Sequence, residues 1–186
     1  HLTSRDRPTE VYGFLISLKF QTHKDWDLIL LDDGGGTPLY SYYFIERILN
    51  QLREEGHRIK LLRNEHSYKV CKARNKLIDN DDYGNPFVYR GDDDTILEPD
   101  VFQKLLDTIH QGFDACSGVI PNCGDPPIVR STKKVKPIIS RIDIDKEGTP
   151  TYVGDDCGYK FLTDEIIPTH HFRTYFLYKS EIQKKV

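Results

Sequence analysis

Hydrophobic positions along the first two thirds of the chain follow two alternating patterns. In four segments the apolar side chains recur three and four residues apart, which is the spacing of an amphipathic helix. These segments are residues 9–20, 44–52, 70–78 and 99–109. Short apolar runs typical of buried strands lie between and after them, at residues 26–31, 58–62, 87–90 and 115–120. Strands that alternate with helices in this order predict an α/β fold, with a mostly parallel central sheet and helices on both faces.

The pattern changes after about residue 120. Three prolines interrupt it, and residues 138–144 alternate only loosely between apolar and polar side chains. Residues 146–148 are typical of a hairpin turn, and residues 174–178 are typical of a strand. We therefore expect a nucleotide-binding type of first half, followed by an irregular and partly antiparallel second half.

Composition narrows the class of protein. The chain has 186 residues, of which 38% are hydrophobic and 30% charged, and this mixture excludes collagen-like and disordered chains. The formal net charge is −3, whereas nucleic-acid-binding domains are typically basic. We therefore expect no nucleic-acid partner. Four cysteines without a Cys-x-x-Cys pair favour a reduced, cytoplasmic protein.

Acidic side chains follow two of the predicted strands. Asp32 and Asp33 come directly after one strand, and Asp92, Asp93 and Asp94 come after another. Parallel strands bring their carboxyl ends to one edge of a sheet, where α/β proteins bind ligands. The loop of residues 3–8 precedes the first helix, so we expect it at the same edge, after a strand that lies before the sequence begins. These side chains are therefore expected to share one crevice.

A crevice that holds three adjacent carboxylates needs a cation. Two unit charges about 5 Å apart repel by roughly 3 kcal/mol at an effective dielectric constant of about 20. Hard oxygen ligands suit Mg²⁺ or Mn²⁺, which proteins hold with one or two carboxylates and substrate phosphates. Alternate residues of an extended segment point the same way, so Asp92 and Asp94 are the expected metal ligands. The alternative is that the acidic turns only end strands and cap helices.

Several motifs together resemble family 2 glycosyltransferases, which have the GT-A nucleotide-diphospho-sugar transferase fold. The first is Asp-Asp-Gly-Gly after an apolar strand, and the others follow it in the family's order. They lie at residues 32–35, 73–75 (Ala-Arg-Asn), 92–94 (Asp-Asp-Asp) and 97–100 (Leu-Glu-Pro-Asp). Residues 17–26 and the loop of residues 3–8 are also similar, although Asp6 stands where Asn is usual. The resemblance covers about residues 1–115.

The resemblance implies an enzyme that moves a sugar from a nucleotide-diphosphate donor to an acceptor hydroxyl. It implies a UDP-sugar as donor, Mn²⁺ or Mg²⁺ as cofactor, inversion at the sugar carbon, and a saccharide, lipid or other hydroxyl compound as acceptor. The residues that it assigns to nucleotide-sugar binding are Thr3, Arg5, Asp32, Asp33, Arg74, Asp92 and Asp93. Asp92 and Asp94 are the metal ligands that it implies.

The resemblance also divides the chain by function. We expect one GT-A domain over residues 1–186, with a nucleotide-sugar-binding half at 1–120 and an acceptor-side half at 121–186. The catalytic base is expected beyond Val186, because residues 175–180 resemble the segment that precedes it in the family. Within the chain four carboxylates are weaker candidates for that base: Asp155, Asp156, Asp164 and Glu165.

Two other functions remain open at this stage. One is a GT-A-like domain that binds a nucleotide or a partner without turnover. The other is a phosphatase of the haloacid dehalogenase type, whose nucleophile loop Asp92-x-Asp94 resembles, although the loop comes late and Ile96 stands where Thr or Val is expected.

Three further groups in the second half carry weaker hypotheses. His170 and His171 could contact the donor or a metal, and Cys123, Cys157 and His170 could bind zinc, although they lack its usual ligand spacing. Lys133 and Lys134 could meet an anionic acceptor or lipid headgroups, which would place the protein peripherally at the inner face of the membrane.

Overall fold

The computed structural model describes residues 1–118, 129–130, 140–144, 146–147, 150–154, 161–162 and 176–183. The contacts of the chain group it into two compact units. The first unit consists of His1–Cys116 and Thr174–Val186, and the second of Ser117–Arg173. The assignment of one half of the chain to the donor and the other to the acceptor stays a prediction.

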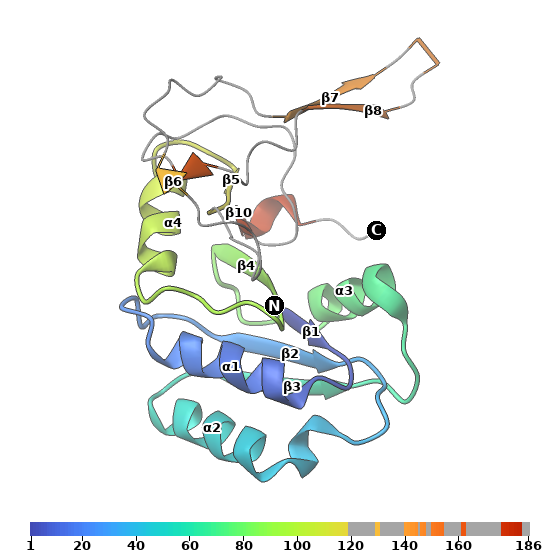
Figure 1. Ribbon diagram of the computed structural model, residues 1–186, viewed down its shortest axis with the longest axis vertical. Helices are drawn as coiled ribbons and strands as arrows, with labels where there is room; N and C mark the ends of the chain where they lie inside the picture. Colours follow the sequence, from blue (N-terminus) through green and yellow to red (C-terminus); the bar gives the residue numbers. More distant parts are fainter. Residues whose placement is uncertain are drawn as a thin grey trace. The chain divides into compact units, whose positions relative to one another are not determined.

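The first unit is built on a six-stranded sheet in the order β3-β2-β1-β4-β10-β5 (Figure 1). Its strands are β1 (Leu2–Ser4), β2 (Leu28–Asp32), β3 (Ile59–Arg63), β4 (Phe87–Asp92), β5 (Ala115–Cys116) and β10 (Phe176–Lys179). The first four strands are parallel, and β10 runs antiparallel to both β4 and β5. The predicted mostly parallel sheet is confirmed.

Two expectations about strands were wrong. The first strand is not missing, because Leu2–Ser4 form β1 between β2 and β4. Leu2 is fully buried, so the apolar core holds this short segment in the sheet and Thr3 lies within a strand. The strand expected at residues 115–120 ends at Cys116, where its ladder with β10 stops; Ser117 and Gly118 lie outside it.

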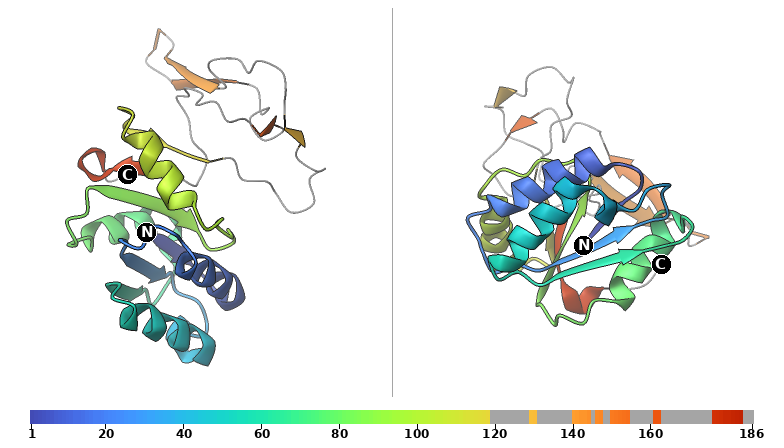
Figure 2. Two further views of the ribbon diagram at one scale, coloured as in Figure 1. Left: turned by 90° about the vertical axis from the view of Figure 1, so that its left-hand side faces the viewer. Right: turned by 90° about the horizontal axis from the view of Figure 1, so that it is seen from below.

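Helices cover both faces of the sheet, as expected (Figure 2). The α-helices of the described residues are α1 (Pro8–Lys19), α2 (Tyr43–Glu54), α3 (Lys69–Asp79) and α4 (Val101–Ile109). Successive residues of a strand point to opposite faces, so Leu28 and Leu30 pack with α1 and α2, whereas Ile29 and Leu31 pack with α3. Burying one such side chain contributes about 1.5–3 kcal/mol, which makes β2 the centre of the core.

A buried glutamine fixes the segment after the acidic residues of β4. The Nε2 of Gln21 donates to the carbonyl oxygens of Ser17 (3.2 Å) and Glu98 (2.8 Å). Its Oε1 accepts the backbone N–H of Phe102 at 3.1 Å. Gln21 thereby ties the end of α1 to the start of α4, which explains in physical terms why this position belongs to the motif that residues 17–26 carry.

The second unit contains two small sheets among its described residues. β6 (Val129–Arg130) pairs in parallel with β9 (Phe161–Leu162). β7 (Ser140–Ile144) and β8 (Pro150–Gly154) form an antiparallel ladder, with a turn at residues 146–147. The predicted hairpin is confirmed. Two short 3₁₀ helices, η1 (Leu39–Ser41) and η3 (Ser180–Ile182), belong to the first unit.

Candidate functional site

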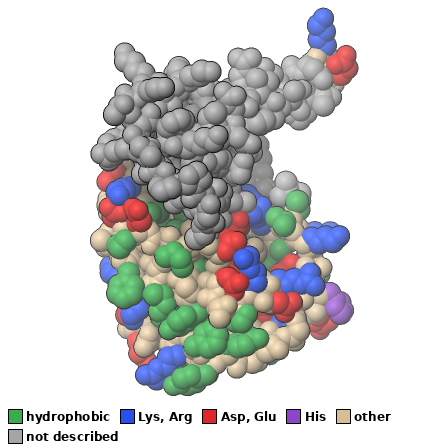
Figure 3. Space-filling model, in the orientation of Figure 1, with side chains coloured by type: hydrophobic (Ala, Val, Ile, Leu, Met, Phe, Trp, Pro, Cys, Tyr) green, Lys and Arg blue, Asp and Glu red, His purple; other side chains and the backbone are tan. Residues whose placement is uncertain are grey.

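The acidic strand ends lie at one edge of the sheet. In the parallel ladders Ser4 of β1 is opposite Asp32 and Thr3 is opposite Asp92. The pairing continues one step beyond β2, because the backbone N–H of Asp33 donates to the carbonyl oxygen of Ser4 at 2.8 Å. The prediction that the two acidic groups share a sheet edge is confirmed. Acidic and basic side chains lie next to one another on the face between α1 and α3 (Figure 3).

Asp32 points into the protein and holds the loop that follows β2. Its Oδ2 accepts the backbone N–H of Leu39 at 3.0 Å and pairs with the Arg63 guanidinium. Arg63 also donates to the carbonyl oxygen of Gly35 at 2.8 Å. Asp32 is buried, so its contacts are those of a residue that shapes the loop of residues 33–39.

Asp33 receives three hydrogen bonds from the loop between β3 and α3. Its Oδ1 accepts from Asn64 Nδ2 (2.6 Å) and from the backbone N–H of Tyr68 (3.0 Å). Its Oδ2 accepts from the Ser67 hydroxyl at 2.8 Å. A carboxylate offers about four acceptor positions, so Asp33 can accept one more donor while the loop stays in place.

The glycines after Asp33 are required by close backbone approach. Gly34 has φ +72°, and a Cβ there would lie 2.4 Å from the carbonyl carbon of His66. A Cβ on Gly35 would lie 2.1 Å from Asp6 Oδ1, and that oxygen accepts the Gly36 N–H at 2.8 Å. The three loops at the sheet edge therefore pack directly against one another, which gives the Asp-Asp-Gly-Gly motif a steric cause.

The acidic loop after β4 is tied to β1 and to the loop after it. The buried Asp93 accepts from the Ser4 hydroxyl through Oδ2 (2.5 Å) and from Arg7 Nη1 through Oδ1 (2.8 Å). Burial raises the pKa of Asp93 above the usual aspartate value, although the Ser4 hydrogen bond and the Arg7 charge oppose the rise. Arg7 Nη2 also lies 3.2 Å from Asp94 Oδ2.

The remaining predicted residues lie around this loop. Arg74 of α3 reaches Asp92, with 3.5 Å between Nη2 and Oδ1. Thr3 is opposite Asp92 in the sheet. Arg5 is exposed, and its Nε lies 3.8 Å from Asp6 Oδ2. The structure thus brings together Thr3, Asp92 and Arg74, and it leaves Arg5 at the surface.

The carboxylates of the acidic loop fit a divalent ion that takes its other ligands from a substrate. Within the described ranges no group of three or more His, Cys, Asp or Glu side chains could hold a metal ion by itself. Mg²⁺ and Mn²⁺ sites that use substrate phosphates need only one or two protein carboxylates. Asp92 and Asp94 are partly exposed carboxylates two residues apart, and their hard oxygen atoms fit the donor chemistry of such an ion.

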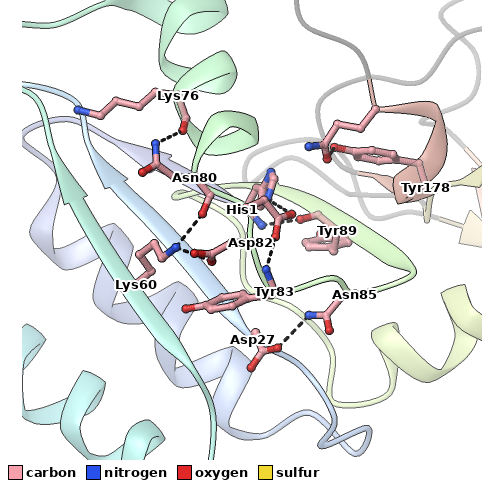
Figure 4. A network of polar contacts seen from close by, with 12 residues as sticks. His1, Asp27, Lys60, Lys76, Asn80, Asp82, Tyr83, Asn85, Tyr89 and Tyr178 are labelled. Carbon is pink, nitrogen blue, oxygen red and sulfur yellow. Dashed lines mark hydrogen bonds and ion pairs between the residues drawn. The ribbon is translucent and has the colours of Figure 1, made fainter.

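A cavity of about 310 Å³ lies at the opposite end of the strands. It is lined by the amino-terminal residues of β2 and β4, including Leu28, Phe87 and Val88. Figure 4 shows polar contacts around it: Asn85 Nδ2 donates to Asp27 Oδ2 at 2.9 Å, and the His1 α-amine donates to the Tyr89 carbonyl at 2.8 Å. Because it lies at the amino ends, this cavity is not part of the acidic edge.

Charged side chains follow β1, β2 and β4 at one edge of a mostly parallel sheet, in an α/β fold of the GT-A-like class. The chain belongs to glycosyl transferase family 2, whose sequence profile matches residues 3–167. Members of this family are enzymes that transfer a sugar from a nucleotide-sugar donor. The family resemblance and the enzyme class are thereby confirmed, and the phosphatase alternative has no support.

Known proteins that are similar to this chain include pgtA and TarS. A bifunctional glycosyltransferase pgtA of Dictyostelium discoideum is 32% identical over 89 residues, which is 46% of this chain and 11% of that protein. The crystal structure of S. aureus TarS 1-349 matches 97% of this chain and 46% of its own, with a TM-score of 0.59 and 13% identity. The second likeness shows the fold alone. The chain spans only a small part of the curated relative and less than half of the TarS structure.

Several predicted candidates lie outside the described residues, so the structure does not place them. They are the base candidates, the histidine pair, the zinc candidates and the lysine pair: Asp155, Asp156, Asp164, Glu165, His170, His171, Cys123, Cys157, Lys133 and Lys134.

The sequence analysis did not assign a role to several polar residues of the site, among them Ser4, Arg7 and Asn64. Asn64 follows β3 directly, so the rule that located Asp33 at a strand's carboxyl end could have found it. Ser4 and Arg7 lie in the segment already expected at this edge, but only the folded chain shows their pairing with Asp93.

Proposed function

We propose that this chain binds UDP-sugars and, within its whole protein, transfers their sugar to an acceptor hydroxyl with the help of Mn²⁺ or Mg²⁺. The observation that carries the proposal is that Asp33 and Asp92 lie beside β1 at its carboxyl end and Asp94 pairs with Arg7 of the loop after β1, in a chain of glycosyl transferase family 2. A nucleotide-sugar carries its base at one end and its diphosphate farther along, so its base would meet Asp33 while its diphosphate would meet the second acidic group through a divalent ion.

Asp33 is the proposed acceptor for the base. Three of its acceptor positions are used by Asn64, Ser67 and Tyr68, so the carboxylate is rigid before a ligand arrives. A fixed acceptor favours a base that presents an N–H group, as uracil does, because such a base can donate to the remaining acceptor position and a base without that donor cannot. Thr3 and Arg5 are proposed to line the same nucleotide pocket.

Besides recognition of the base, the proposed transfer requires positive charge near the diphosphate of the donor. Breaking the bond between the sugar and the phosphate builds negative charge on the leaving nucleoside diphosphate, and cations stabilise that charge as it forms. Arg74, held 3.5 Å from Asp92, is proposed to lie beside the donor. A divalent ion between Asp92 and Asp94 would supply Lewis-acid stabilisation of the same charge.

The chemical step also needs a base for the acceptor hydroxyl, which is a poor nucleophile at neutral pH. Inversion and the identity of this base, whether beyond Val186 or among Asp155 and Asp156, remain proposals. So do the acceptor, the cytoplasmic location and peripheral membrane association. Among the described residues, no helix is both long enough and apolar enough to span a bilayer.

The test is calorimetric titration of the purified chain with UDP and with UDP-sugars, in the presence and absence of Mn²⁺. We expect UDP to bind more tightly with Mn²⁺, and Asp94→Ala to weaken that binding by about 10-fold or more, as loss of a metal ligand does. Asp107→Ala is the matched control, because Asp107 is an exposed aspartate on α4. The proposal would be overturned if the affinity for UDP changed neither on addition of Mn²⁺ nor in the Asp94→Ala variant.

A further inference from the structure

We propose that Asp93 is a positioning residue, which contacts neither donor nor metal but orients the carboxylates on either side of it through Ser4 and Arg7. This inference rests on the proposed function, since it concerns how the same site is shaped. It also revises the role that the family resemblance implies for Asp93, which is nucleotide-sugar binding.

Burial separates Asp93 from its two neighbours. Its side chain is 6% exposed, whereas those of Asp92 and Asp94 are 28% and 45% exposed. β4 ends at Asp92 and the chain turns at Asp93 and Asp94, so the middle side chain faces inward while the two beside it are partly exposed. Asp93 therefore points into the protein at the position where its neighbours point toward the edge of the sheet.

Both oxygens of Asp93 have partners inside the protein. The Ser4 hydroxyl donates to Oδ2 at 2.5 Å and Arg7 Nη1 donates to Oδ1 at 2.8 Å. A buried carboxylate needs such donors, because a charge out of water is costly unless it is paired and hydrogen-bonded. A donor or metal ion would therefore have to approach a side chain that is only 6% exposed and whose two oxygens already accept from Ser4 and Arg7.

Ser4 links the two acidic groups of the site. Its hydroxyl donates to Asp93, and its carbonyl oxygen accepts the backbone N–H of Asp33. β1 thus connects the proposed base-binding carboxylate with the acidic loop through a single residue. Ser4 is itself buried in the ladder with β2. Its two hydrogen bonds therefore fix the position of the acidic loop relative to the backbone of Asp33.

Arg7 spans two consecutive carboxylates. One nitrogen of its guanidinium lies 2.8 Å from Asp93 and the other lies 3.2 Å from Asp94. The planar fork of a guanidinium sets the geometry of the groups that it bridges. While Asp93 holds one arm of the fork, only the other arm reaches Asp94. Without Asp93, the whole fork is available to Asp94 and would compete with a metal ion for it.

The experiment measures Mn²⁺ affinity in the presence of UDP, by the electron paramagnetic resonance signal of unbound Mn²⁺, together with the thermal midpoint of unfolding. Four variants are compared with the wild-type chain: Asp93→Ala, Asp93→Asn, the double variant Asp93→Ala/Arg7→Ala, and the control Asp107→Ala. Asn keeps the shape of Asp and can still accept from Arg7 and donate to the Ser4 hydroxyl, but it carries no charge.

We expect Asp93→Ala to weaken Mn²⁺ binding by about 10- to 100-fold, which is the usual effect of removing a residue that orients a metal ligand without contacting the metal. Asp93→Asn should stay within about threefold of the wild type, because an amide can satisfy both partners. The double variant should bind at least about threefold more tightly than Asp93→Ala, since Arg7 no longer occupies Asp94, and such coupling marks residues in contact. Asp107→Ala should change nothing.

Three results would overturn the inference. If Asp93 were itself a ligand, Asp93→Asn would lose Mn²⁺ affinity as much as Asp93→Ala. If Asp93 only stabilised the fold, Asp93→Ala would lower the thermal midpoint and leave the Mn²⁺ affinity of the folded protein unchanged. If removing Arg7 did not raise the Mn²⁺ affinity of the Asp93→Ala variant, Arg7 would not compete with Mn²⁺ for Asp94. Failure of the proposed function looks different, because the wild-type chain itself would then bind no Mn²⁺ with UDP.

Discussion

The side-chain amide of Asn64 donates to the carboxylate of Asp33 across 2.6 Å. Asn64 is almost completely buried, and its amide oxygen accepts from Lys76 Nζ at 2.5 Å. Lys76, on α3, therefore orients the amide, and the amide orients the carboxylate. The proposed base-recognition residue is fixed by a chain of polar contacts that begins on a helix.

Replacing Asn64 with Ala is expected to destabilise the fold and weaken UDP binding together. The change removes one of the three hydrogen bonds to Asp33 and one of the two acceptors of Lys76, and a buried polar group that loses its partner costs about 1–3 kcal/mol. Urea unfolding measures the first effect and UDP titration the second. Asn50→Ala on the exposed side of α2 is the control and should change neither. An Asn64→Ala protein with wild-type stability would show that this contact contributes nothing.

Gly35→Ala is expected to destabilise the protein through Asp6. The added Cβ would lie 2.1 Å from Asp6 Oδ1, so the aspartate must move and release its hydrogen bond with the Gly36 N–H. We expect a loss of about 1–2 kcal/mol in the free energy of unfolding. In an Asp6→Ala background the same substitution should cost clearly less, because only the 3.2 Å approach to the backbone nitrogen of residue 6 remains.

Gly36→Ala provides the matched control for this pair, because nothing lies within 4 Å of a Cβ at that position. A double-mutant cycle in urea measures the coupling between Gly35 and Asp6. Equal effects of Gly35→Ala with and without Asp6 would show that the close approach is not the cause.

Lys69→Gly is expected to stabilise the chain. Lys69 has φ +59° at the start of α3, a left-handed conformation that costs an L-residue about 1–2 kcal/mol and glycine almost nothing. The free energy of unfolding should rise by about 1 kcal/mol, less the extra entropy that glycine gains in the unfolded chain. Lys69→Ala removes the amine but keeps the strain, so it should not stabilise; a gain with Ala would point to the charge instead.

The sequence predicted the edge of the sheet on which the site lies, because periodicity identified the strands and parallel strands align their carboxyl ends. The expectation that Asp92 and Asp94 hold a metal ion together came from alternation in an extended segment and stays a prediction, because the chain turns at Asp93 and Asp94. It could not distinguish the inward role of Asp32 from that of Asp33. That difference depends on Arg63 and Asn64, which β3 brings next to β2 from about 30 residues away along the chain.

β10 shows the same limit at the level of the fold. Residues 176–179 have an apolar pattern that identifies a strand, but no local feature indicates that they insert between β4 and β5. Their antiparallel pairing is stabilised by long-range contacts, such as Leu177 with Leu105 and Ile109 of α4. The pattern of one sequence therefore predicts that a strand forms, but not which distant strand it pairs with.

Asp27 is expected to make the stability of the protein depend on pH in the acid range. Burial works to raise the pKa of Asp27, but hydrogen bonds from the Arg58 side chain, Asn85 and the Arg58 backbone outweigh it, so the pKa is lowered. The unfolded chain then binds more protons than the folded one near the unfolded pKa of about 4. The stabilisation by Asp27 is fully present above that pH and is lost as the pH falls through the lower, folded pKa.

Asp27→Asn should therefore have a smaller free energy of unfolding than the wild type at pH 7, and the two curves should converge as the pH falls below about 4. Urea unfolding at a series of pH values measures the difference. Asp25→Asn is the control, because Asp25 is exposed two residues away and its curve should run parallel to that of the wild type. A difference between Asp27→Asn and the wild type that stays constant down to pH 2 would mean that the Arg58 and Asn85 contacts stabilise the fold without favouring the ionised carboxylate.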